Sequence, residues 1–407
     1  MKFKQLSNAV FLPGLTALLT GLTALPAGAE TFYEISGKVS ADLRYFTQDA
    51  QFPNQDYDTN LSFAAEPEFY WEWNDGTDSI TFTPFLRVDE NDNERTHGDI
   101  RELSWIHVGD EWEVKVGLSK VFWGVTEFQH LVDVINQTDG VEDFDGEDKL
   151  GQQMINLSLV RDWGIVDIFL LPGFRERTFA GEDGRLRAGL VVDTDYAQYE
   201  SGAGEKHLDA AIRWSHTLGD FDMGLYWFHG TNRDPILQPQ MISGNNVLVP
   251  YYEQMDQIGF DLQATIDSWL WKFETIHRDS SSDKYLAAQA GFEYTFYGIQ
   301  ESAADLGVLL EYGWDERGED ADAAIQNDLF MGARLALNDA ESTEVLAGIS
   351  HDLDYDSQSL IVEASRRFGE NWNVSIDGRF FTADDAADLS YNIKQDDHLQ
   401  LTVERYF

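Results

Sequence analysis

The end of the chain alternates in polarity over the length of a full strand. From 398 to 407 the odd positions are apolar, except for Arg405, and the even positions are polar or amphipathic. Residues 35–45 and 61–73 follow the same two-residue period. Side chains of a β-strand point alternately to opposite faces, so this period predicts strands with one apolar and one polar face. The pattern recurs along the chain without a linker, which favours an all-β fold in one domain.

The first residues predict an export signal. Lys2 and Lys4 precede an apolar stretch from Val10 to Leu25, and Ala27-Gly28-Ala29 fits a small-residue cleavage site. We therefore expect a signal peptide at 1–29 and a mature chain that begins at Glu30. No later apolar run is long enough for a transmembrane helix.

Short and long connections alternate between the expected strands. Short polar turns are predicted at 74–76, 109–110, 163–164, 218–220, 267–268, 338–339 and 369–371, and the connection at 297–305 is somewhat longer. Nine longer links lie between them, roughly at 47–59, 90–99, 122–153, 173–206, 230–254, 279–284, 315–327, 352–357 and 382–397. The pattern predicts about 18 antiparallel strands, with about 16 as the alternative because 100–108 alternates poorly. Pro67 and Pro84 interrupt predicted strands and mark bulges or irregular rims.

The closing strand, with its terminal Phe407, resembles that of Gram-negative outer-membrane β-barrels. The resemblance implies a transmembrane antiparallel up-and-down β-barrel at 30–407, located in the bacterial outer membrane. It also implies that Phe407 is an assembly signal read by the barrel-assembly machinery. The expected partners are outer-membrane lipid, lipopolysaccharide and small polar solutes, and a homotrimer is one option for the assembly. Arg405 departs from the family pattern, which has an apolar or aromatic residue there.

The third long link carries the main candidate for a functional site. Classical porins fold their third long loop into the channel, and this link resembles it in position. Val116-Gly117 followed by Trp123-Gly124 also resembles alginate-export-type and related uncharacterised barrels, although Leu118 replaces their usual Arg. Six acids crowd the link, which is typical of a solvated loop, a pore constriction or a Ca²⁺ site. They are Asp139, Glu142, Asp143, Asp145, Glu147 and Asp148, of which Asp143 and Asp145 are the candidate Ca²⁺ ligands.

The next long link is basic. Arg175, Arg177, Arg185 and Arg187 lie within 13 residues. They could face the acidic loop across the pore, bind lipopolysaccharide phosphates, or pair with the nearby Glu176, Glu182 and Asp183. The polar face of the strands predicts a charged lumen wall, with Arg44, Glu66, Glu68, Arg87, Lys115 and Arg213 among its residues.

Charge and composition exclude several function classes. A formal net charge of −45 argues against nucleic acid as a partner. The absence of cysteine excludes a lipid-modified Cys and a disulfide framework. No G-x-S-x-G or H-E-x-x-H motif is present, so neither an enzyme nor a cofactor is predicted. We expect a passive channel with a modest cation preference, because inward acids outnumber inward bases. The alternatives are a substrate-specific export or uptake barrel and a plugged structural or adhesive barrel.

Overall fold

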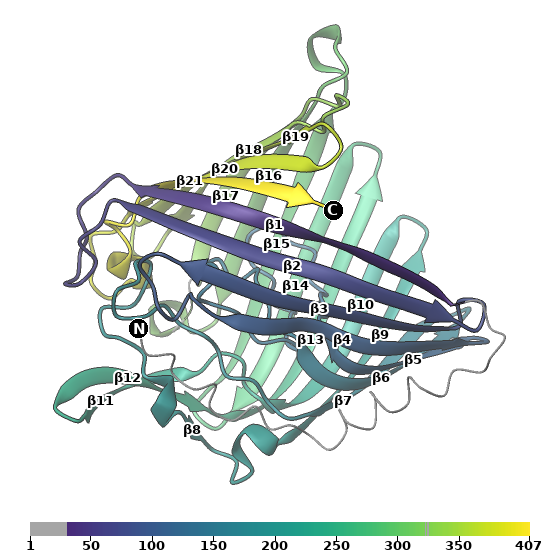
Figure 1. Cartoon of the computed structure of the whole chain (residues 1–407), viewed down its shortest axis with the longest axis horizontal. Coiled ribbons are helices and arrows are strands. Elements are labelled where there is room, and N and C mark those ends of the chain that lie inside the picture. The colour runs from purple at the N-terminus through teal and green to yellow at the C-terminus, as the bar shows by residue number, and fades with distance from the viewer. Residues whose placement is uncertain (1–30, 322, 324) are drawn as a thin grey trace.

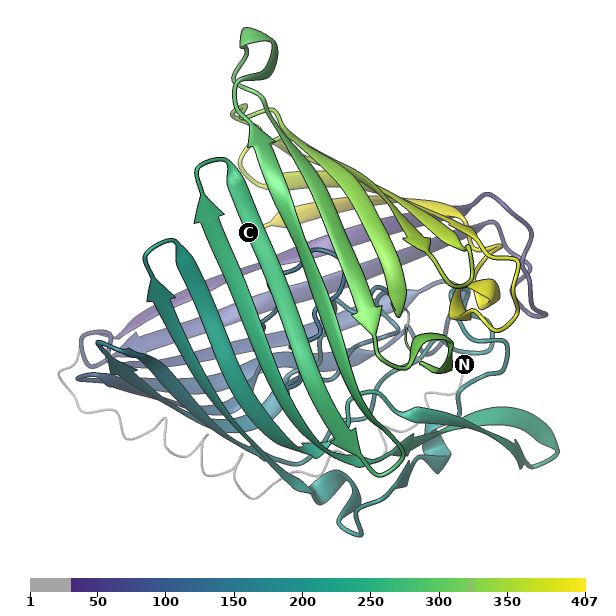
Figure 2. The same cartoon turned by 180° about the vertical axis from the view of Figure 1, so that it is seen from behind.

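The structure is a computed structural model that describes residues 31–321, 323 and 325–407. The expected signal peptide lies outside the described residues. Within them, eighteen strands form one closed sheet (Figures 1 and 2). The barrel strands are β1 (Phe32–Phe46), β2 (Thr59–Trp73), β3 (Asp78–Asp89), β4 (Gly98–Gly109), β5 (Trp112–Ser119), β6 (Gln152–Arg161), β7 (Gly164–Pro172), β9 (Leu208–Leu218), β10 (Phe221–Thr231), β13 (Gln254–Ile266), β14 (Trp269–Ser280), β15 (Lys284–Phe296), β16 (Asp305–Asp315), β17 (Asn327–Ala336), β18 (Glu344–Asp352), β19 (Gln358–Phe368), β20 (Trp372–Thr382) and β21 (His398–Tyr406).

Each barrel strand pairs antiparallel with the next, and β21 pairs with β1 to close the ring. Closure leaves no open sheet edge, which is what a β-structure surrounded by lipid requires. The predicted all-β barrel of 18 strands is confirmed. In the described part of the chain, no helix has the length and hydropathy needed to cross a membrane.

Apolar side chains cover the outside of the wall. Val39, Leu43, Leu225, Ile258 and Leu401 are exposed there, on the faces that the two-residue period assigned to lipid. Aromatic rings gather at the end of the barrel that carries the short turns. Trp269, Trp271, Phe292 and Tyr294 pack with ring centroids 4.6 to 5.4 Å apart. An apolar band bounded by aromatic residues is typical of membrane barrels.

Nine connections lie at one end of the barrel and eight at the other, counted over the described residues. The longest links are all among the nine, but the link between β14 and β15, expected at 279–284, has only three residues. The long links also contain structure that the sequence did not predict. β11 (Ile236–Ile242) and β12 (Asn245–Tyr252) form a hairpin, and β8 (Gln198–Tyr199) pairs with β12. This small sheet projects beyond the barrel (Figure 1). The 3₁₀ helices of the described residues are η2 (Thr194–Tyr196), η3 (Gly204–Lys206), η4 (Ile299–Glu301), η5 (Gly318–Asp320) and η6 (Leu389–Asn392).

β4 explains why residues 100–108 alternate poorly. Ile100 lies opposite Pro84, whereas Glu102 lies opposite Thr83, so Arg101 is an extra residue in the ladder. A β-bulge of this kind shifts the alternation by one residue and redirects the side chain at the bulge. Proline at 84 lacks the N–H that a regular ladder would need, which accounts for the irregularity at this position. The bulge turns Arg101 inward, where it is buried.

Candidate functional site

The link between β5 and β6, residues 120–151, folds into the barrel, and we call it the inserted loop. Val132, Val134 and Ile135 are almost fully buried, and they pack with apolar side chains of the inner wall. These wall residues include Met154, Phe169, Leu171, Phe228 and Ile276. The wall behind the loop is therefore apolar on both faces. The unbroken apolar run at 168–172 was the sequence signal for this, because a strand covered on both faces reads as a continuous apolar stretch.

The two glycines of the sequence motif lie where the backbone packs closely. Gly117 has φ +141°, and a Cβ there would lie 2.1 Å from the carbonyl oxygen of Leu103 in β4. A Cβ on Gly124 would lie 2.2 Å from Nδ1 of His130, within the inserted loop itself. Both positions thus need a residue without a side chain. The motif marks the point where the chain leaves the wall and turns into the lumen.

A buried carboxylate, Glu274 of β14, holds the first part of the inserted loop. Its Oε1 accepts hydrogen bonds from the backbone N–H of Val125 (2.6 Å) and Thr126 (2.9 Å) and from the Thr126 hydroxyl (2.8 Å). Its Oε2 accepts from the N–H of Val132 at 3.2 Å. Backbone groups inside a barrel need such partners, because an unpaired buried N–H is costly. Glu274 therefore fixes the position of the loop on this wall.

Neighbouring strands add further contacts to the same wall. Glu311 of β16 accepts from the N–H groups of Glu127 (2.8 Å) and Phe128 (3.2 Å). The carboxylate of Glu127 accepts in turn from Lys272 of β14 (3.3 Å) and Arg334 of β17 (2.5 Å). The inserted loop is thus tied to β14, β16 and β17.

His130 lies between two carboxylates, with Nε2 3.4 Å from Glu147 Oε1 and Nδ1 3.9 Å from Glu274 Oε1. Burial alone would lower the pKa of His130, but its interactions with Glu147 and Glu274 outweigh burial and raise the pKa to about 10. The imidazole is therefore charged at neutral pH and adds an ionic contact between the two parts of the loop and β14.

The acids of the inserted loop meet arginines on the opposite wall. The pairs are Asp139 with Arg101 of β4 (2.5 Å), Glu142 with Arg87 of β3 (2.7 Å), Asp143 with Arg44 of β1 (3.4 Å) and Asp145 with Arg379 of β20 (3.7 Å). Arg95, in the link between β3 and β4, also donates to the carbonyl oxygens of Val141 and Glu142. The loop therefore crosses the lumen from β14, β16 and β17 to β1, β3, β4 and β20. Behind the front strands of Figure 2, coil crosses the barrel interior.

These contacts change the charge that the acidic run presents. Burial and the neighbouring Asp143 raise the pKa of Asp145 to about 7, and burial with the surrounding carboxylates raises the pKa of Asp148 to about 6. Burial would also raise the pKa of Asp139, but His97 and Arg101 hold it well below its usual range. Glu147 is the most exposed acid of the four that lie in ion pairs at 142–147. Ion pairs and raised pKa values therefore neutralise most of the acidic run at 139–148. The inserted loop does not present six free negative charges to the lumen.

The four arginines of the next link have partners distant in sequence. Three of them pair with distant carboxylates, Arg175 with Asp99 (2.7 Å), Arg177 with Asp234 (3.8 Å) and Arg185 with Asp396 (2.7 Å). Arg187 donates to the carbonyl oxygen of Ala188 (2.9 Å) and lies 5.0 Å from the ring of Phe52. Arg185 is buried and also donates to the carbonyl oxygens of Gln48 and Gln395. In the described residues, none of the four forms an ion pair with Glu176, Glu182 or Asp183, which the sequence offered as local partners. Arg185 instead joins three long links over the barrel mouth.

The remaining predicted wall residues differ in their surroundings. Arg213 of β9 forms two hydrogen bonds with Asp261 of β13 (2.6 and 2.9 Å) and lies over the Trp123 ring. It thus joins the wall to the start of the inserted loop. Lys115, Glu66 and Glu68 are partly exposed. A cavity of about 730 Å³ opens beside the inserted loop, between it and the links that follow β7, β10 and β14.

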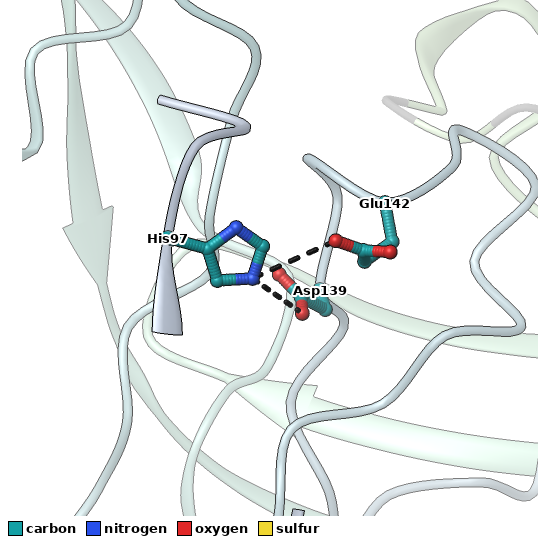
Figure 3. Close-up of side chains that lie close together, drawn as sticks. All are labelled: His97, Asp139 and Glu142. Atoms are coloured by element: carbon teal, nitrogen blue, oxygen red, sulfur yellow. Dashed lines mark ion pairs between the residues drawn. The ribbon is translucent and has the colours of Figure 1, made fainter. Parts of the chain in front are cut away.

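One group of side chains has the composition of a metal site. His97, Asp139 and Glu142 place one ligand atom each within 4.8 Å of one another, and no other such group of three occurs in the described part of the chain (Figure 3). The predicted Ca²⁺ ligands Asp143 and Asp145 are not in this group and face guanidinium groups instead.

No protein-family model and no curated protein matches the chain. Among solved structures, two mutants of Rh. blastica porin are each 11% identical to the chain with a TM-score of 0.46, and each alignment covers 92% of this chain and 100% of that chain. A triple mutant of Rhodopseudomonas blastica porin is also 11% identical, with a TM-score of 0.45 and the same coverage. A likeness at this identity and TM-score adds nothing to the closed antiparallel barrel that the strand pairing shows.

Proposed function

We propose that the protein is an outer-membrane channel through which small polar solutes diffuse passively. The observation that carries this proposal is a loop held inside a closed barrel whose exterior is apolar. An apolar exterior suits a lipid environment, and a polar interior narrowed by a fixed loop suits size-limited diffusion. Lipid, lipopolysaccharide and the barrel-assembly machinery are the partners expected of a protein in that location.

We propose a modest preference for cations, supported by the excess of acids over bases on the inward face. The inserted loop contributes less to it than its six acids suggest, because four of them face wall arginines. Selectivity would then depend mainly on wall carboxylates that lack a guanidinium partner.

A plugged barrel is the second candidate, favoured by one observation. The apolar side chains Val132, Val134 and Ile135 of the inserted loop pack against the wall with almost no exposed surface. A plugged barrel would not conduct, whereas a channel would leave a path on the side of the 730 Å³ cavity.

Conductance of the purified full-length protein in planar bilayers tests the proposal. A channel gives discrete current steps, and a reversal potential in a tenfold KCl gradient gives the sign of the selectivity. Heat-denatured protein is the control for detergent artefacts. If folded protein inserts, as judged by its heat-modifiable gel band, and no steps appear, the barrel is plugged. A reversal potential whose sign shows a preference for chloride would contradict the cation preference but not the channel function.

A further inference from the structure

We propose that His97, Asp139 and Glu142 bind a Zn²⁺ ion that joins the inserted loop to the link between β3 and β4. His97 comes from that link, and both carboxylates come from the inserted loop (Figure 3). The proposal does not depend on the channel function, since a metal can fix a loop in a conducting or a plugged barrel.

The imidazole is held in the orientation that a metal ligand needs. Nδ1 of His97 lies 3.0 Å from the carbonyl oxygen of Arg95, so Nδ1 carries a proton and donates it there. Histidines that bind metals usually donate their second ring N–H to a carbonyl or carboxylate in this way. Nε2 is buried and has no hydrogen-bond partner. With Nδ1 protonated, Nε2 faces the two carboxylates and holds either a lone pair that can bind a metal or a second proton that makes an imidazolium.

The distances fit one small ion between the three groups. Nε2 lies 3.7 Å from Asp139 Oδ2 and 3.6 Å from Glu142 Oε1, which is too long for hydrogen bonds. Zinc bonds to nitrogen and oxygen of about 2.1 Å in a tetrahedron separate the ligand atoms by about 3.4 Å. A shift of a few tenths of an ångström would bring the two His97 separations to this value, and the two carboxylate oxygens lie within 4.8 Å of each other. Three protein ligands leave the fourth position for water.

Both carboxylates are already fixed by groups behind them. Asp139 accepts from Arg101 and, through its other oxygen, from Thr178 at 2.6 Å. Glu142 accepts from Nε of Arg87 at 2.9 and 3.0 Å. Each carboxylate oxygen has two lone pairs, so a hydrogen bond on one leaves the other for a metal. Such outer hydrogen bonds are a regular feature of metal sites.

The charge of the surrounding network leaves room for a cation. The described contacts join five carboxylates, those of Asp42, Asp89, Asp99, Asp139 and Glu142, to four guanidinium groups, those of Arg87, Arg95, Arg101 and Arg175. One negative charge is in excess, and His97 lies beside it. One imidazole with two carboxylates suits zinc better than Ca²⁺ or Mg²⁺, which take six or more oxygen ligands. The alternative is a protonated His97 that balances the charge without metal.

Metal titration of the full-length protein in detergent distinguishes a Zn²⁺ site from a metal-free ion pair of protonated His97. After treatment with a chelator, the protein is titrated with Zn²⁺ in competition with a chromophoric chelator, and Co²⁺ serves as the spectroscopic substitute. We expect one Zn²⁺ per chain and a visible absorption band of tetrahedral Co²⁺. His97→Gln and Glu142→Gln should each weaken Zn²⁺ binding by about 100-fold or more and remove the band.

His107→Gln is the matched control, because His107 contacts a single carboxylate, Asp78, at 2.9 Å. It should bind Zn²⁺ like the wild type. The heat-modifiable band shows whether each variant folds, and Glu142→Gln provides the result if His97→Gln does not fold. Equal Zn²⁺ affinity for folded wild type and either ligand variant would overturn the proposal and assign His97 to a metal-free ion pair.

Discussion

At the scale of single residues, Glu274 makes many of the hydrogen bonds that hold the inserted loop against the wall. One carboxylate accepts from three backbone N–H groups and one hydroxyl, all in the segment 125–132. Hydrogen bonds to a charged acceptor contribute about 1.5–3 kcal/mol each, and a buried donor left unpaired costs about as much. The wall strand and the loop are therefore coupled through this one side chain.

We predict that Glu274→Gln loosens the inserted loop without unfolding the barrel. The amide keeps one acceptor oxygen but turns an N–H₂ group toward donors, at a cost of about 3 kcal/mol. Single-channel recordings should show larger and noisier open-state currents than the wild type. Glu404→Gln is the control, because Glu404 is bonded to Lys38, Asn373 and Tyr406 of the wall and not to the loop. Identical current noise in both variants would mean that Glu274 does not anchor the loop.

At the scale of elements, acids of the inserted loop form ion pairs with arginines of the wall. Asp143→Asn with Asp145→Asn removes two carboxylates and leaves Arg44 and Arg379 without these partners. We predict a lower ratio of K⁺ to Cl⁻ permeability, measured as reversal potential in a tenfold KCl gradient. Because the pKa of Asp145 is raised to about 7, its carboxyl is charged above that pH. The change should therefore be larger at pH 8.5 than at pH 5.5. An unchanged ratio at both pH values would place the pair outside the ion path.

The elements also show what a sequence can and cannot predict. The wall was predictable because lipid and lumen impose opposite polarity on alternate residues, and turns need particular residues. The ion pairs could not be predicted. Arg185 and Asp396, for example, are 211 residues apart, and the sequence around either residue does not indicate its partner. The sheet of β8, β11 and β12 was not predicted. Its strands lie outside the barrel wall, so no contrast between an apolar exterior and a polar lumen imposes an alternating pattern on them. The inward position of Arg101 depends on a β-bulge opposite Pro84. The proline predicted an irregularity in the strand but not which residue would turn inward.

At the scale of the whole molecule, the ring depends on the pairing of its first and last strands. The N–H of Phe407 donates to the carbonyl oxygen of Gly37 at 3.1 Å, just beyond the ladder of β1 and β21. We predict that deletion of Phe407 slows insertion and weakens the heat-modifiable band, while Phe407→Tyr keeps both near wild type because the aromatic ring and the backbone remain. Normal amounts of folded protein in the deletion would show that assembly does not use this residue.

The inserted loop also has a mechanical consequence. Polar contacts fasten it to β14, β16 and β17 and to β1, β3, β4 and β20, and its apolar segment packs on β6, β7 and β10. A hollow cylinder yields most easily by flattening into an ellipse. Attachments spread around the ring resist flattening along more than one diameter. In a membrane, lateral pressure would then deform this barrel less than an empty ring of the same number of strands.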